Sequence, residues 1–532
     1  MGKNGPPGIS RWGKVSGSLP FPPLRTPIDS MSASTSPEQA PLYQRKERDG
    51  PLSFSTKLYQ GIGAIPDTIK NLVFNTFVLL FYNQILGVEP VLVSVALAIS
   101  VVFDAITDPV VATLSDHAVT RYGRRHPLML ISALPLGACL YAVFVPPAGL
   151  SEMQLFGWLL AFTLLTRGFM TLYFVPWSAI AAELSDDYFE RTSVMAFRFA
   201  VGWLVGGSFP LFVYTYIMPA TEAFPAGQLN PAGYAPMALL AGCMLSAGAL
   251  ATTLLTWREI PYLRQPAEDE KGFGLKQTLN DLKEALRNPQ YALIFSIVLI
   301  SSAIAGTTAN LGIYMTTFFW GLTTEDLRWF AFIGFGALAA FPLVAVIQKR
   351  WDKKHILITC STVSLFEGIA LVTARFMDLL PANGDPMLLY ILIGFGNIAA
   401  AIAVVQGIIA ASIVADLVDD QELRTGLRQE GMFNAGLSFS GKAVSGLGTL
   451  MGGVILTLIE FPEAAKDPDS VPAQSIRNLG IVVGVLVPLF YLIPISLISR
   501  YQITRQRHAE IRRALEIRNH RPHVPEGESR PR

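Results

Sequence analysis

The sequence predicts an all-α membrane protein with twelve transmembrane helices in two six-helix halves, and three observations predict this. Apolar runs long enough to cross a bilayer recur along the chain, a polar stretch divides them into two sets of six, and short motifs repeat between the sets. Composition agrees, because 51% of the residues are hydrophobic and only 15% are charged, whereas soluble globular chains carry about 25% charged residues. An ordinary soluble enzyme is excluded.

The apolar runs give the number of spans, because a helix needs about 20 apolar residues to cross the hydrocarbon core. In the N-terminal six-helix bundle, residues 56–257, we expect spans near 59–86, 90–115, 128–147, 153–182, 193–218 and 236–257. In the C-terminal bundle, residues 289–500, we expect them near 289–319, 327–348, 355–378, 387–414, 431–459 and 478–499.

Three polar segments flank the two bundles. Residues 1–55 are rich in Pro, Gly and Ser and hold no signal-peptide core, so we expect a disordered cytoplasmic tail. Residues 258–288 form the linker, in which leucines at helical spacing predict an amphipathic helix along the membrane surface. Residues 501–532 form a basic cytoplasmic tail.

The basic residues predict the orientation, because cytoplasmic loops carry an excess of Lys and Arg. Such residues gather in the 2–3 connection, the linker, the 8–9 connection and the C-terminal tail, and they are missing from the 1–2, 3–4 and 5–6 connections. We therefore expect a multi-pass protein of the cell (inner) membrane with both termini in the cytoplasm.

An internal repeat relates the halves. Residues 180–192 read IAAELSDDYFERT and residues 413–425 read IVADLVDDQELRT, while RRH at 124–126 is answered by KKH at 353–355 at nearly the same offset. We expect both echoes in cytoplasmic loops. Two halves repeated in parallel about an axis along the membrane normal are the organisation of the major facilitator fold.

Two carboxylates lie inside the second span, where charged groups are costly. Asp104 and Asp108 share one helix face at four-residue spacing, with Thr107 beside them. Two ionised acids in a dry site repel each other, and a bound cation or proton relieves the repulsion. We expect a cation site at these three residues, with Asp104 and Asp108 as the metal ligands if the ion is Na⁺. The alternative is a helix-end pair bound to loop arginines.

Basic residues in other spans are candidates for coupling and substrate contacts. Arg198 in span 5 and Lys442 in span 11 are the expected counter-charges of the acidic pair. Lys442 has the alternative of reaching toward the interface. For Arg167 in span 4 and Glu367 in span 9, a structural ion pair and a substrate contact are equally consistent with the sequence.

Spans 1 and 4 carry further candidates. Asp67 and Lys70 are spaced for a local ion pair. Trp177 is positioned either to stack on a sugar ring or to pack against lipid.

No pattern of catalytic residues is present, so we expect no enzyme activity and no cofactor beyond a coupling ion, Na⁺ or H⁺. The sequence lacks a His cluster with metal-ligand spacing and a phosphate-cradling Gly-Lys-Thr loop. A net charge of +1 gives no sign of nucleic-acid binding. We expect a small-molecule substrate, membrane lipids around the chain, and a monomer, with an ion gradient as the energy source.

Several stretches carry a family resemblance. They are DAITDP at 104–109, GRRHP at 123–127, VP at 175–176, and residues 416–431 with Lys442. In order and spacing they resemble the glycoside–pentoside–hexuronide:cation symporter family (melibiose permease-like) of the major facilitator superfamily, over residues 55–500.

The resemblance implies roles for individual residues. Asp104 and Asp108 match the acidic pair that binds Na⁺, Li⁺ or H⁺ in melibiose permease-like proteins, and Thr107 matches a polar ligand of the same site. Arg198 and Lys442 match the basic residues near the sugar and cation sites.

The sequence departs from melibiose permease at two sugar-site positions. Phe174 and Thr68 stand where that protein has acidic residues. DAITDP and VPWSA at 175–179 are also similar to the sodium-dependent lysolipid symporters of the same family. The resemblance therefore covers the coupling machinery and leaves the solute open.

Together these features predict a secondary active transporter that couples a cation, Na⁺ or H⁺, to symport of a glycoside-like or other small polar or amphipathic solute by alternating access. A proton-driven exporter or a lysolipid-type transporter of the same fold is the alternative. A transport-dead membrane sensor or scaffold, which binds partners through its cytoplasmic tails, is a minor alternative.

Overall fold

The computed structural model describes residues 46, 48, 50–118, 120, 122–185, 187–263, 283, 286–425, 446–465 and 470–519. Within these ranges the chain is helical and contains no strand. Eleven helices are long and apolar enough to cross a membrane, and a shorter apolar helix covers Gly446–Leu458. The predicted all-α membrane fold is confirmed. Lys442 and most of the expected amphipathic linker helix lie outside the described residues.

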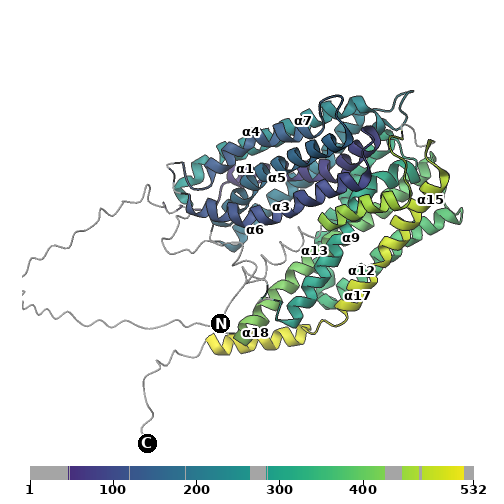
Figure 1. The fold of residues 1–532 in the computed structure, drawn as a ribbon. Coiled ribbons are helices and arrows are strands. Elements are labelled where there is room, and N and C mark those ends of the chain that lie inside the picture. Colours follow the sequence, from purple (N-terminus) through teal and green to yellow (C-terminus); the bar gives the residue numbers. More distant parts are fainter. Residues whose placement is uncertain are drawn as a thin grey trace, which may run out of the picture. The chain divides into compact units, whose positions relative to one another are not determined.

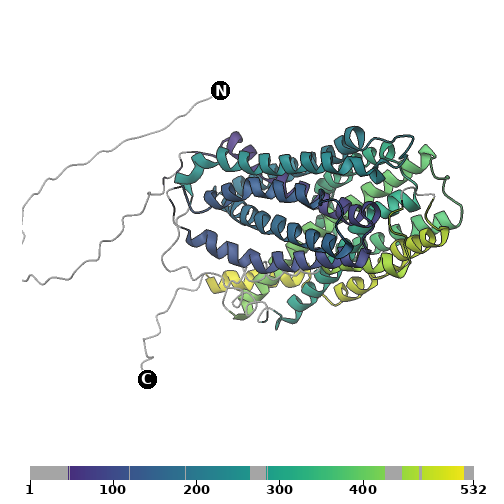
Figure 2. The same ribbon diagram turned by 45° about the horizontal axis from the view of Figure 1, so that its top comes forward.

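The first half consists of six spans. Its first span is a succession of four helical segments, α1 (Phe54–Ile62), α2 (Ala64–Val73) and the π-helices η1 (Phe74–Val78) and η2 (Phe81–Ile85). The next spans are α3 (Pro90–His117), α4 (His126–Val143), α5 (Glu152–Glu183), α6 (Tyr188–Phe212) continued by η3 (Val213–Ile217), and α7 (Tyr234–Leu255) after the short helices η4 (Gly227–Leu229) and η5 (Pro231–Gly233). The half ends with η6 (Trp257–Tyr262). Helix α4 packs against α5 and α7, and α3 packs against α5, as Figures 1 and 2 show.

The second half repeats this plan. It contains α9 (Pro289–Tyr314) with η7 (Met315–Phe319), the short α10 (Thr324–Leu327) and η8 (Arg328–Ile333), then α11 (Gly334–Arg350), α12 (Lys353–Phe376) and α13 (Pro386–Thr425). The last span is formed by α15 (Ala473–Ile481), η10 (Val482–Leu486), α16 (Val487–Leu489) and α17 (Leu492–Ile498). A C-terminal helix, α18 (Arg505–Asn519), follows.

One expectation about the repeat was wrong. Residues 413–425 form the end of α13 instead of a cytoplasmic loop, and residues 180–183 are the last turn of α5. The segment 413–425 contains neither Gly nor Pro, and Arg424 Nε lies 2.8 Å from Asp420 Oδ2 one turn away, which supports the helix. Charged residues ended the apolar run without ending the helix.

The two echoes meet in space and form the same ion pair in each half. In the first half, the side chains of Arg124 and Arg125 contact Glu183, with Arg125 Nη2 2.8 Å from Glu183 Oε1. In the second half, Lys353 Nζ lies 2.6 Å from Asp416 Oδ2, and the repeat aligns Asp416 with Glu183. The repeated motifs therefore form corresponding ion pairs between the start of one span and the end of a neighbouring span.

Glycines allow a second equivalent contact, between α4 and α7 in the first half and between α12 and the last span in the second. A Cβ added to Gly137 would collide with the backbone of Gly242. A Cβ added to Gly368 would come within 2.7 Å of the Pro488 ring. Small residues at these positions permit the close approach of helices that membrane packing requires.

Part of the expected basic tail is a docked helix. Ile511 and Leu515 of α18 are buried in the core of the second half, and His508 Nε2 lies 3.2 Å from Asp419 Oδ2 on α13. Figure 1 shows α18 across the end of α13.

Candidate cation and solute site

Helix α3 brings both predicted acids to one cavity. Asp104 and Asp108 line a cavity of about 260 Å³ together with residues of α2, η1 and α5. Asp104 is buried, and the four-residue spacing places both carboxylates on the side of α3 that packs against α5. The juxtaposition that the sequence predicts is therefore present.

A threonine of α5 joins the two carboxylates. Thr171 Oγ1 lies 3.1 Å from Asp108 Oδ1 and 3.3 Å from Asp104 Oδ1. Arg167, one turn earlier on α5, holds the other oxygen of Asp104, with Nη1 2.6 Å from Oδ2. One carboxylate oxygen of Asp104 is therefore held by the guanidinium of Arg167. The other oxygen faces the Thr171 hydroxyl, which also contacts Asp108.

The structure does not bring Thr107 into this cavity. Its hydroxyl donates to the carbonyl of Phe103 at 3.0 Å, on its own helix, and the side chain is not among those that line the cavity. The carbonyls of Phe103 and Asp104 on its own helix accept from this hydroxyl, at 3.0 and 3.3 Å, and so hold it away from the cavity. Thr171 supplies the hydroxyl in its place.

The basic residue that pairs with the acids is Arg167 instead of the expected Arg198. Arg167 pairs with Asp104, whereas the Arg198 guanidinium lies over the ring of Trp177, 3.7 Å from its centroid. Lys442, the second expected counter-charge, lies outside the described residues. For Arg167 the structure thus shows an ion pair, one of the two possibilities that the sequence left open.

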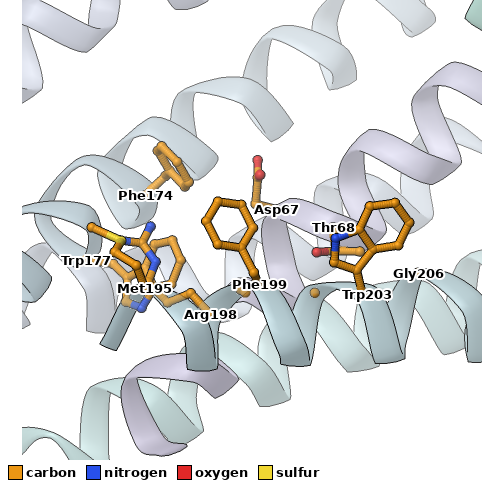
Figure 3. A pocket seen from close by; sticks show the side chains of 11 residues that line it. Asp67, Thr68, Phe174, Trp177, Met195, Arg198, Phe199, Trp203 and Gly206 are labelled. Carbon is orange, nitrogen blue, oxygen red and sulfur yellow. The ribbon is translucent and has the colours of Figure 1, made fainter. Parts of the chain in front are cut away.

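A larger cavity of about 570 Å³ adjoins the acidic one, and Asp67 and Phe174 line both. Figure 3 shows this larger cavity, with Asp67 and Thr68 from α2, Phe174 and Trp177 from α5, and the other labelled residues from α6. Its α6 lining is mostly apolar and aromatic, with Arg198 as the only basic side chain among the described lining residues: Met195, Arg198, Phe199, Gly202, Trp203 and Gly206.

Trp177 does not offer a free ring face. The residue is only 2% exposed, its indole N–H donates to the carbonyl of Gln60 at 3.1 Å, and Tyr173 stacks on it with an interplanar angle of 13°. Arg198 covers the ring as well. In this structure the Trp177 ring packs against Tyr173 and Arg198 instead of presenting a free face to a sugar or to lipid. It holds Arg198 at the cavity wall.

Asp67 forms the local pair that its spacing predicts, with Lys70 Nζ 3.5 Å from Asp67 Oδ1. Both side chains line the acidic cavity. Asp67 therefore adds its charge to the acidic cavity while it also faces the larger cavity.

A third cavity of about 460 Å³ lies between the two halves. It shares Trp203 and Gly206 with the larger cavity and reaches α9 and η8 of the second half. The three cavities are therefore neighbours that lead from the acidic pair, past a mostly apolar chamber, to the boundary between the two halves.

Three polar residues that line the acidic cavity were not predicted from the sequence, namely Thr171, Asn71 and Asn75. Thr171 follows Arg167 by four residues, so both lie on one helix face. That spacing was the available signal for Thr171. Asn71 and Asn75 form a second i, i+4 pair, on the first span.

Comparisons with known proteins agree with this architecture. A family model described as MFS/sugar transport protein matches residues 59–505. The chain belongs to this family.

Relatives of this MFS/sugar transport protein include an uncharacterized symporter, sll1374, of Synechocystis sp., which is 26% identical over 89% of this chain and 98% of its own. A putative glycoside/cation symporter, YagG, of Escherichia coli is 23% identical over 87% and 95%. The sodium-dependent lysophosphatidylcholine symporter 1-A of Danio rerio is 32% identical over 31% of each chain. The predicted family resemblance is confirmed.

The fold is shared with solved transporters. The structure of the nucleoside transporter NupG superimposes with a TM-score of 0.58 at 8% identity, over 85% of this chain and all of that chain. Identity this low establishes the major facilitator fold alone.

Proposed function

We propose that this protein is a secondary active symporter in which Asp104, Asp108 and Thr171 bind Na⁺ as the coupling ion. The shared hydroxyl carries this proposal, because it draws one oxygen of each carboxylate to a single point. Three oxygen atoms of two chemical types are the ligands that a hard cation prefers. A proton would need only one of the carboxylates.

The electrostatics give the acids a reason to bind a cation. Two oxygens that lie 3.1 and 3.3 Å from one atom are at most about 6.4 Å apart. At an effective dielectric constant of about 20, two unit charges at that separation repel by about 2.6 kcal/mol. Arg167 offsets part of this on the far oxygen of Asp104, and a cation at the shared point would offset the rest while it binds both helices together.

The chamber beside the cation site favours an amphipathic solute. Sugar hydroxyls require fixed acceptors, and Asp67 is the one carboxylate among the described residues of the 570 Å³ cavity. Aromatic and apolar side chains make up most of the wall, and Arg198 offers a positive charge for an anionic or zwitterionic head. A glycoside with an apolar aglycone and a lysolipid-like molecule both satisfy this lining, and relatives are named for each class.

Na⁺ coupling at this site would drive uptake into the cell, in an inner-membrane protein with both termini in the cytoplasm. Basic residues at the starts of α4 and α12 support that orientation. A proton-driven exporter of the same fold is the competing function.

Uptake by proteoliposomes tests the proposal. Reconstituted protein is given a Na⁺ gradient, a proton gradient or neither, with radiolabelled alkyl glycosides and lysophosphatidylcholine as solutes. The proposal predicts accumulation driven by Na⁺ and abolished by Asp108→Asn. Accumulation driven only by the proton gradient, or insensitive to Asp108→Asn, would overturn it.

A further inference from the structure

The second half contains a cavity that the cation and solute sites do not use. About 450 Å³ in volume, it lies among α9, α12, α13 and the segments η10 and α16 of the last span. Glu367 of α12 faces this cavity. The residue lies nine positions before the end of α12 at Phe376, about 14 Å along the helix, so its carboxylate is at membrane depth.

Glu367 makes no ion pair and no hydrogen bond within the described part of the chain. The other polar groups of the cavity are neutral: the hydroxyls of Thr308 and Ser364, the amide of Gln406 and the phenol of Tyr491. An ionised carboxylate in such surroundings is costly unless a positive partner arrives.

Core packing gives no reason for a charge at this position. Glu367 directly precedes Gly368, where an added Cβ would come within 2.7 Å of the Pro488 ring. The Glu367 side chain lines a cavity instead of a filled core, and core packing alone gives no reason for a carboxylate there.

Among the described residues, no neighbouring element brings a charged group to Glu367. Segments η10, α16 and α17 contain no charged residue, and Tyr491 is the only other titratable side chain among the described lining residues. On α12 itself, Lys353 binds Asp416 and Arg375 Nη1 donates to the Pro381 carbonyl at 2.8 Å.

Arg375 of α12 and Arg477 of α15 lie toward the opposite end of the bundle from Lys353. Other charged groups of α12 and α13 lie toward the end where Lys353 lies. Lys354 of α12 donates to the carbonyls of Ser499 and Tyr501. His355 is twelve residues from Glu367, about 18 Å along the helix. Asp416 is ten residues beyond Gln406 on α13, about 15 Å. The remaining acids of α13, and Lys349 and Arg350 of α11, follow toward the same end.

We propose that Glu367 is a proton-binding site, distinct from the Na⁺ site, whose protonation changes during transport. A proton neutralises the carboxylate without a second acid, and this cavity has no second acid among its described residues, as a tight metal site would need. A bound proton makes the carboxyl neutral, and a neutral carboxyl is compatible with closure of the cavity. Release of the proton requires the cavity to admit water. Transport therefore depends on pH through a residue in the half that lacks the Asp pair.

Infrared difference spectroscopy of the full chain tests this directly, without any solute. Wild type, Glu367→Gln and a matched control, Glu325→Gln, are titrated with pH while the carbonyl stretch of protonated carboxyl groups is recorded. Glu325 is an exposed glutamate on α10, so its loss is expected to leave the membrane-depth signal unchanged. We expect a titrating band in wild type and in Glu325→Gln, and the loss of one titrating carboxyl per chain in Glu367→Gln.

An identical titrating band in all three proteins, or no titration of the Glu367 component at any pH, overturns the proposal. Thermal midpoints in detergent check folding, and Glu367→Gln is expected to melt at or above the wild-type midpoint because it removes a half-buried carboxylate that has no ion pair among the described residues. Asp104→Asn separates this proposal from the previous one, since it is expected to abolish Na⁺ binding and to retain the Glu367 band. In transport, Glu367→Gln is expected to flatten the pH profile and to retain Na⁺ dependence.

Discussion

Replacement of Thr171 by Val tests the geometry of the proposed cation site, because valine has the same shape and lacks the hydroxyl. In the structure the Thr171 hydroxyl lies 3.1 and 3.3 Å from the two carboxylates, so it would orient both acids and present its oxygen lone pairs to a bound Na⁺. Loss of a group that orients metal ligands typically costs about 10–100-fold in metal affinity. We therefore expect Na⁺ affinity to fall at least about tenfold.

The assay is the rise in thermal midpoint of the detergent-solubilised protein with Na⁺ at constant ionic strength, which gives an apparent Kd without a solute. Thr171→Ser restores the hydroxyl and is expected to retain affinity. Thr107→Val is the matched control on α3, because its hydroxyl bonds to its own helix, and we expect a change of about twofold or less. A tenfold loss in Thr107→Val with wild-type affinity in Thr171→Val would refute the assignment.

Three further predictions concern packing and ion pairs, each measured by thermal midpoint in detergent unless stated. Gly137→Ala is expected to lower the free energy of unfolding by about 1–3 kcal/mol, because its Cβ would overpack against Gly242. The control Gly157→Ala meets open space and is expected to leave stability unchanged or raise it. Equal shifts of the thermal midpoint in both variants would contradict the contact. Glu183→Gln is expected to lower the free energy of unfolding by about 3–5 kcal/mol, because it leaves two buried arginines without their carboxylate partner. For Asp116→Asn, whose native side chain is 45% exposed, the expected loss is about 1 kcal/mol or less. A smaller loss for Glu183→Gln than for Asp116→Asn would show that the ion pair does not stabilise the fold. Ile511→Ala is expected to release α18 and expose its arginines to trypsin, whereas Ile517→Ala, 62% exposed on the same helix, leaves cleavage unchanged; slow cleavage in both would mean that α18 is held by its ion pairs alone.

Much of the fold could be predicted because membrane thickness and apolar runs impose it. The run expected at 289–319 is the span Pro289–Phe319, and the other described spans begin and end within several residues of their predicted limits. The exception is α13, which continues to Thr425. Its polar end contains neither Gly nor Pro, and Arg424 pairs with Asp420 one turn away. Hydropathy locates the lipid boundary and not the helix end.

The site was predicted only as far as one helix determines it. Asp104 and Asp108 share a face by spacing alone, so their meeting in one cavity followed from the sequence. The contacts of Thr171 and Arg167 with them depend on how α5 packs against α3, which no local pattern encodes. Arg198 was assigned to the acids by charge, whereas a neighbouring aromatic ring on α5 holds it.

Equilibrium binding of radiolabelled Na⁺ to the purified protein tests most directly whether the Asp pair holds the coupling ion. The structure predicts saturable binding of one ion per chain in wild type and in Thr107→Val, and no saturable binding in Asp104→Asn or Asp108→Asn. Wild-type binding in either Asp variant, with the fold intact, would contradict it.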